Sequence, residues 1–249
     1  MKKMMTMLVT ALCVAVLYCG DAERLEELER ICAFVPCDDL RVKEVIPMPE
    51  DIIAKYHITT NQLVADLKTV AMKYDPYEQD ESNREVRSFA VAQLGRFCST
   101  NDLVFLAKIM TNNTDHAQLS AIGASINVLR FSPELIDLVR GIVTNNTTYS
   151  ALIREQTCVW LTNKCQPKFK TMYINDSAQH ARIAAFFVEQ AGVNGDMIIT
   201  MDNYACKLNP WYRHSQQRRD NLARLRPPGL TGRPKEIYDA AQRDAVQED

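Results

Sequence analysis

Histidine and cysteine are the residues of this 249-residue chain that most often carry catalysis or bind a metal ion. The four histidines, His57, His116, His180 and His214, lie far apart in the sequence. They form no His-Glu-x-x-His motif, and the cysteines form no paired Cys-x-x-Cys motif. A Gly-rich phosphate loop and a Gly-x-Ser-x-Gly nucleophile elbow are absent as well. We therefore expect no catalytic residue, no metal and no cofactor, with an enzyme built from distant residues as an alternative.

The cysteines suit disulfide chemistry better than metal binding. Cys32 and Cys37 flank a loop-like Ala-Phe-Val-Pro segment, which predicts a local bridge between them. Cys158 and Cys165 share one predicted helix and stand ~10 Å apart along it, too far for a disulfide. Cys165 with Cys206 is a further candidate pair.

The N-terminus has the pattern of an export signal. Lys2 and Lys3 precede an uncharged apolar stretch over residues 4–17, and small Gly20 and Ala22 stand at the positions that a signal peptidase recognises. We predict cleavage after Ala22 and hence an exported protein, whether periplasmic, at the cell surface or secreted. A lipid on Cys19 and an uncleaved membrane anchor are the alternatives, and only these would place the chain at a membrane.

A run of arginines near the C-terminus is the clearest candidate binding surface. An anionic partner such as a phosphate-bearing envelope polymer would suit it, and so would the acidic segment after Ala22 of a second copy. A solvated face with no partner is the alternative. The predicted contact residues are Arg213, Arg218, Arg219, Arg224 and Arg226.

Residues 51–68 resemble a helix-turn-helix DNA reader, with two short helices around a break at His57. The second helix carries Asp66 beside a single basic residue, Lys68, so it offers few contacts for phosphates. An exported protein also does not meet chromosomal DNA. We therefore predict no nucleic-acid partner and two packed helices that cap the rest of the fold.

The elements that would position these residues are helical. Glycine contributes only 8 residues, so tight turns are few. The middle of the chain repeats a pair of amphipathic helices, and a closing Thr-Asn-Asn-Thr recurs 33 residues on. The first helices of successive copies are predicted at 86–94, 118–126, 153–161 and 181–188, and the second helices at 102–110 and 134–143.

One such pair cannot bury its apolar face alone, so the pairs are expected to stack. The small residues of the first helices would allow close approach. The pattern resembles the HEAT and armadillo-like α-solenoid proteins over roughly residues 83–193. Arg87 and Arg154 fit the arginine of a HEAT unit, whereas Leu119 stands at that position in the second copy. An irregular helical bundle is the alternative.

The resemblance implies an all-α superhelix of HEAT-like hairpins with helical extensions at both ends. Its expected function is binding of an unidentified protein or envelope polymer without catalysis. A structural or assembly component of the cell envelope is the alternative. The predicted domains are a signal peptide (1–22), a helical cap and linker (23–82), the repeats (83–209) and a basic helical extension (210–249).

Overall fold

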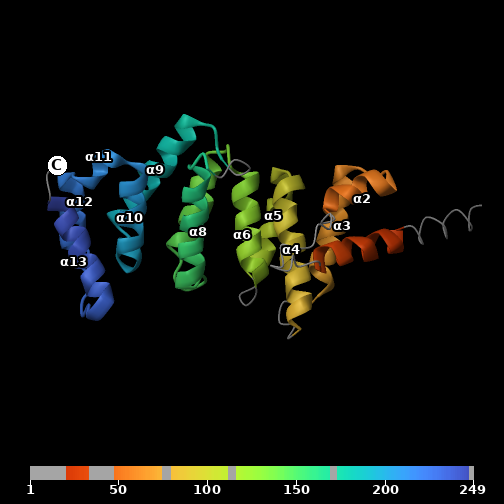
Figure 1. The fold of residues 1–249 in the computed structure, drawn as a ribbon, viewed down its shortest axis with the longest axis horizontal. Helices are drawn as coiled ribbons and strands as arrows, with labels where there is room; N and C mark the ends of the chain where they lie inside the picture. The colour runs from red at the N-terminus through yellow and green to blue at the C-terminus, as the bar shows by residue number, and fades with distance from the viewer. Residues whose placement is uncertain (1–20, 34–47, 75–79, 112–115, 169–172, 247–249) are drawn as a thin grey trace, which may run out of the picture. The chain divides into compact units, whose positions relative to one another are not determined.

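The computed structural model describes residues 21–33, 48–74, 80–111, 116–168 and 173–246, and within these ranges the chain forms helices and no strand (Figure 1). The predicted all-α class is therefore confirmed. The signal segment up to residue 20 lies outside the described residues. Within the described ranges, no helix combines the length and apolar character needed to cross a bilayer.

A helix over residues 21–33 comes first. The helices that follow it are α2 (Pro49–Tyr56), α3 (Thr60–Lys73), α4 (Glu81–Phe97), α5 (Leu103–Met110), α6 (His116–Val128), α7 (Glu134–Val143), α8 (Ala151–Lys164), α9 (Ser177–Ala191), α10 (Ile198–Leu208), α11 (Pro210–Arg213), α12 (Gln216–Arg224) and α13 (Gly232–Val246).

Two of the predicted helix starts have a hydroxyl side chain that caps the helix. The Thr59 hydroxyl accepts a hydrogen bond from the Gln62 backbone N–H, and Ser215 does the same for Arg218. The sequence also predicts Ser132 as an N-cap, and this is wrong, because Pro133 occupies the N-cap position of α7 and no side chain caps that helix. The Ser132 carbonyl instead accepts a hydrogen bond from a glutamine side chain of α9.

The chain divides into two compact units, Met1–Val128 and Leu129–Asp249. The division falls inside the predicted second hairpin, so α6 and α7 belong to different units. It does not coincide with the predicted boundaries at residues 83 and 210, and those boundaries stay a prediction.

In the first unit, α4 packs between α3 and α6, and α5 packs on α6 (Figure 1). A Cβ atom on Gly95 of α4 would lie 2.6 Å from the Ala124 Cα of α6. Only glycine permits this approach, so the predicted role of small residues in close packing is confirmed here. The α2–α3 pair of the helix-turn-helix segment also packs together, and α3 lies against α4.

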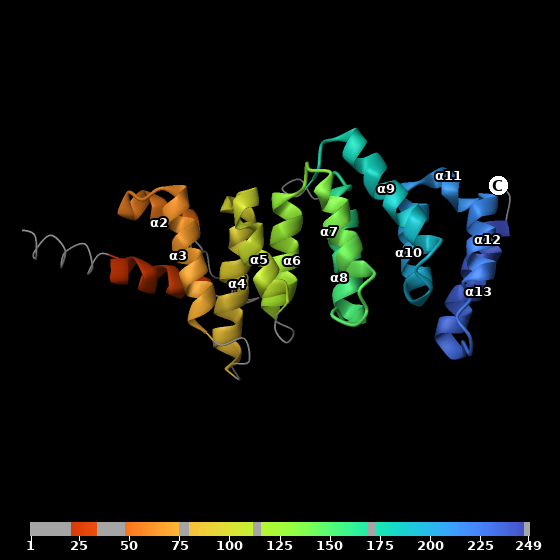
Figure 2. The ribbon, with the colours of Figure 1, turned by 180° about the vertical axis from the view of Figure 1, so that it is seen from behind.

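In the second unit, helices two positions apart along the chain lie together. α9 packs on α7 and on α10, while α10 packs on α8 (Figure 2). Segment 181–188 in α9 therefore lies beside α7, a predicted second helix, and its assignment to a fourth repeat copy stays a prediction. α12 and α10 both contact α13, so the C-terminal extension is part of this unit.

Buried side chains donate hydrogen bonds to backbone carbonyls at the C-terminal ends of several helices. The Arg87 Nε of α4 donates to the Ala71 carbonyl in the last turn of α3, at 3.1 Å. Gln118 of α6 donates to the Met110 carbonyl at 2.7 Å, and Arg154 of α8 to the Val143 carbonyl at 3.3 Å. Gln118 thus takes the role that Arg87 and Arg154 have in the other copies, one residue before Leu119. Such donors satisfy carbonyls that a helix leaves without an internal partner.

The cysteine predictions have mixed outcomes. Cys37 lies outside the described residues, so its bridge to Cys32 stays untested, whereas Cys165 and Cys206 are not bonded to each other. Cys158 is fully buried, as expected of a small apolar residue. Burial raises the pKa of its thiol to about 12.

Candidate functional site

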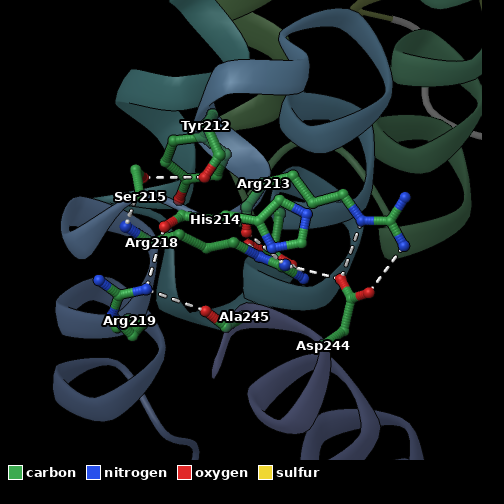
Figure 3. A network of polar contacts seen from close by, with 9 residues as sticks. Tyr212, Arg213, His214, Ser215, Arg218, Arg219, Asp244 and Ala245 are labelled. Carbon is green, nitrogen blue, oxygen red and sulfur yellow. Dashed lines mark hydrogen bonds and ion pairs between the residues drawn. The ribbon is translucent and has the colours of Figure 1, made fainter. Parts of the chain in front are cut away.

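A network of ion pairs joins α10, α11, α12 and α13 in the second unit (Figure 3). The Arg218 Nε and Nη2 atoms both lie 2.9 Å from the carboxylate of Asp202, a two-pronged contact. The Arg218 Nη1 lies 2.7 Å from Asp244. The same Asp244 carboxylate receives Arg213 Nη2 at 2.7 Å, so it stands between two guanidinium groups. We call these four residues the Asp244 network.

Burial distinguishes the two carboxylates of the Asp244 network. The side chains of Arg218 and Asp202 are each 3% exposed, and that of Asp244 is 34% exposed. The hydrogen bond from Arg213 lowers the pKa of Asp244 to about 2 against an opposing effect of burial, with further help from Arg218. Burial raises the pKa of Asp202, while the Arg218 guanidinium opposes that shift. Because arginine stays protonated, Arg218 holds a positive charge against the Asp202 carboxyl group.

A cavity of 510 Å³ lies beside the Asp244 network and is lined by α10 and α13 as well as by the network itself. Cys206 also lines it, but burial raises the pKa of this thiol to about 12, so it is not a ready nucleophile. The two acids that converge on the cavity are each held by arginine. The Asp244 network therefore has the chemistry of a structural contact between helices, because its carboxylates are paired with its own arginines.

The structure brings the five predicted arginines together only in part. Arg218 is occupied inside the Asp244 network. Arg219 donates to the backbone carbonyls of His214 and Ala245 (Figure 3). Arg224 donates to the backbone carbonyl of Gly192. The side chains of Arg213, Arg224 and Arg226 are nevertheless exposed. For these three residues, contact with an anionic partner stays a prediction.

A second hollow, in the first unit, is mainly apolar. It has a volume of 770 Å³ and lies between the helix of residues 21–33, α3 and the Phe105 side chain of α5. We call it the N-terminal groove. Its apolar lining includes Leu25, Val70 and Met72, the last of which is 50% exposed. The Lys68 ammonium stands 5.4 Å from the Phe105 ring centroid.

Charged residues at the rim of the N-terminal groove are paired. Lys68 contacts Asp102 at 2.6 Å, and Lys73 contacts Glu29 at 2.5 Å. Glu26 also lines the groove and is exposed. An apolar floor with a charged rim is typical of a surface that receives an apolar side chain of a partner.

Sequence reasoning missed both hollows and most of their residues. Asp202 and Asp244 lie 42 positions apart on helices whose packing no local pattern reveals. The sequence pattern assigns Trp211 only to a helix break, yet its side chain is 91% exposed. The signal that could have found it is the residue type itself, since an aromatic side chain in a polar segment is a frequent binding anchor.

No known family model matches the chain, and neither curated proteins nor solved structures contain a significant match.

Proposed function

We propose that this protein is an exported α-solenoid scaffold that binds a protein or an envelope polymer and does not catalyse a reaction. The observation that carries the proposal is the packing of helices two positions apart, seen for α4 with α6, α7 with α9 and α8 with α10. Stacked helical pairs need this alternation, because each helix must cover the apolar face of its counterpart in the next pair.

Binding surfaces would be formed by the predicted second helices, by α5 within the first unit and by α7 within the second. Their buried faces hold Leu106 and Val139, whereas Lys108, Glu134 and Asp137 are exposed. Exposed charges set which partners are attracted and which are repelled. A partner held by this surface should therefore respond to charge reversal there.

Affinity capture from the envelope fraction of the native host tests the binding function. The test variant combines Lys108→Glu, Glu134→Lys and Asp137→Lys. The control variant carries Glu81→Lys and Glu155→Lys, two exposed positions on first helices. We expect the test variant to lose a partner that the wild type and the control retain. A partner retained equally by all three chains would contradict the proposed surface.

The export part of the proposal needs its own test. Residues 1–22 fused to a reporter that is active only outside the cytoplasm should produce activity, and Lys2→Glu with Lys3→Glu should lower it. Mass spectrometry of the native protein would show a chain that begins at Glu23, or a lipid on Cys19 if that alternative holds. An intact N-terminus in the cytoplasm would refute export and reopen the helix-turn-helix hypothesis.

A second candidate function is assembly with other copies of the same chain. The observation that favours it is the almost complete exposure of Trp211, together with an apolar groove in the other unit.

A further inference from the structure

The N-terminal groove leaves unusual apolar surface uncovered in the described part of the first unit. Met72 lines it at 50% exposure, and Val104, next to the lining residue Phe105, is 81% exposed. A chain that begins at Glu23 would still keep the lining residues Leu25, Glu26 and Glu29. All lining residues except Ala22 therefore stay in the chain if the first 22 residues are removed.

Trp211 in the second unit is held rigidly while its indole stays in solvent. It follows Pro210, whose ring fixes the backbone at the start of α11. The next residue, Tyr212, is 3% exposed, and its hydroxyl oxygen accepts a hydrogen bond from Asn221 at 3.3 Å. Arg213, one residue further, is tied to Asp244. An aromatic side chain on a fixed backbone loses little conformational entropy on binding.

The two surfaces have opposite charge. The helix of residues 21–33 has five acidic and two basic residues. The segment 207–235 around Trp211 has eight basic residues and one acidic residue, Asp220. Part of this charge is paired internally, but Glu23 and Glu26 on one surface and Lys207 and Arg224 on the other are exposed. Opposite charge steers such surfaces together and repels like ends.

We propose that Trp211 of one copy docks into the N-terminal groove of a second copy, so that the chain associates head to tail. A groove of 770 Å³ accommodates an indole, which can bury ~150–250 Å² of surface. The acidic helix beside the groove would face the basic segment around Trp211. Because the two surfaces differ, a head-to-tail dimer keeps one free groove on one copy and one free tryptophan on the other, and association continues beyond a dimer. This inference rests on the second proposed function, assembly.

Sedimentation velocity over a roughly 100-fold range of protein concentration tests the proposal. The wild type should grow from monomer to species larger than a dimer. Trp211→Ala removes the anchor, and we expect association to weaken about 30-fold or more. Met72→Lys blocks the groove with a charge beside Lys68 and Lys73, and it should weaken association similarly. Both positions are exposed, so both variants should fold. Leu152→Ala, at a side chain that is 61% exposed, is the matched control and should associate like the wild type.

An equimolar mixture of the two variants gives the sharpest result. Trp211→Ala keeps an intact groove, and Met72→Lys keeps an intact tryptophan, so each alone associates only weakly, whereas the mixture forms a heterodimer that cannot extend. In a Trp160→Phe background, the emission of Trp211 should shift to the blue as concentration rises.

The other outcomes distinguish the docking of Trp211 into the N-terminal groove from assembly in general. A wild type that associates without dependence on Trp211 or Met72 would overturn the docking site and leave assembly standing. A wild type that stays monomeric would overturn both. A blue-shifted emission at every concentration would place Trp211 against its own chain. Binding to phosphatidylglycerol vesicles that depends on Trp211, without self-association, would assign it to a lipid surface.

Discussion

Gly95→Ala is a small change that tests the tightest contact of the first unit. Alanine is the better helix former, so the substitution alone would stabilise α4 by about 1 kcal/mol. The new Cβ, however, would lie 2.6 Å from the Ala124 Cα and 3.0 Å from its Cβ. Carbon atoms in good contact stand ~3.5–4.0 Å apart, so α4 and α6 must separate by roughly 1 Å.

The free-energy cost of separating α4 from α6 decides whether Gly95→Ala stabilises or destabilises the protein. The obstacle is backbone, so no side-chain rotation relieves it, and overpacking of this kind costs typically ~1–3 kcal/mol. A gap of ~1 Å also removes up to about half of the contact energy along the interface. We take the upper end, about 3 kcal/mol, and expect Gly95→Ala to lower the free energy of unfolding by about 2 kcal/mol after the gain in helix propensity.

Gly141→Ala is the matched control. Gly141 is exposed within α7, and no atom lies within 4 Å of the place that a Cβ would take there, so this variant should gain up to about 1 kcal/mol. Urea unfolding followed by circular dichroism measures both changes. If Gly95→Ala stabilises the protein as Gly141→Ala does, the close approach of α4 to α6 is wrong.

Three further predictions concern the second unit. Asp202→Ala leaves the 3%-exposed Arg218 with one carboxylate instead of two and should cost about 3 kcal/mol in urea unfolding. The lowered pKa of Asp244 means that its ionised form stabilises the fold above its ordinary value near 3.8, and that this stability is lost as pH falls towards about 2. The effect should be about 1–2 kcal/mol, since the side chain is 34% exposed and partly screened. Cys158, whose thiol pKa is raised to about 12, should react with iodoacetamide at pH 8 only as fast as the fold opens.

Each of these predictions has a control. Asp220→Ala changes an exposed acid on α12 and should shift stability by less than about 0.5 kcal/mol. Asp244→Asn should remove the acid-dependent loss between about pH 4 and pH 2. Unfolded protein sets the maximal rate of Cys158 alkylation, and a native protein that reacts equally fast would contradict its burial.

Local signals in the sequence predicted the helices well, because capping and periodicity act within a few residues. Thr59 and Ser215 begin helices as predicted, and Pro210 separates α10 from α11. The polar pattern near the C-terminus predicts a helix from Lys235, but α13 begins at Gly232, because Pro234 is tolerated in a first helical turn.

The direction in which each arginine points could not be predicted in the same way. Arg218 and Arg224 belong to one short basic helix, yet Arg218 is buried and Arg224 is exposed. The difference depends on Asp202 and Asp244, which reach Arg218 from two other helices. The helix that supplies a carboxylate to an arginine is set by packing between segments far apart in the sequence. Local residue spacing does not reveal it.

The backward donation from α4, α6 and α8 to the preceding helix has a consequence for how the chain is made. The last carbonyls of α3, α5 and α7 find Arg87, Gln118 and Arg154 only after the following helix has been synthesised. On the ribosome, each of these helices would therefore emerge with a C-terminal carbonyl that lacks its side-chain donor. The donor would arrive only with the next helix. Native structure would then trail synthesis by 8 to 16 residues at these three helix ends, and a chain that stops early would expose the end of its last helix to quality-control proteases.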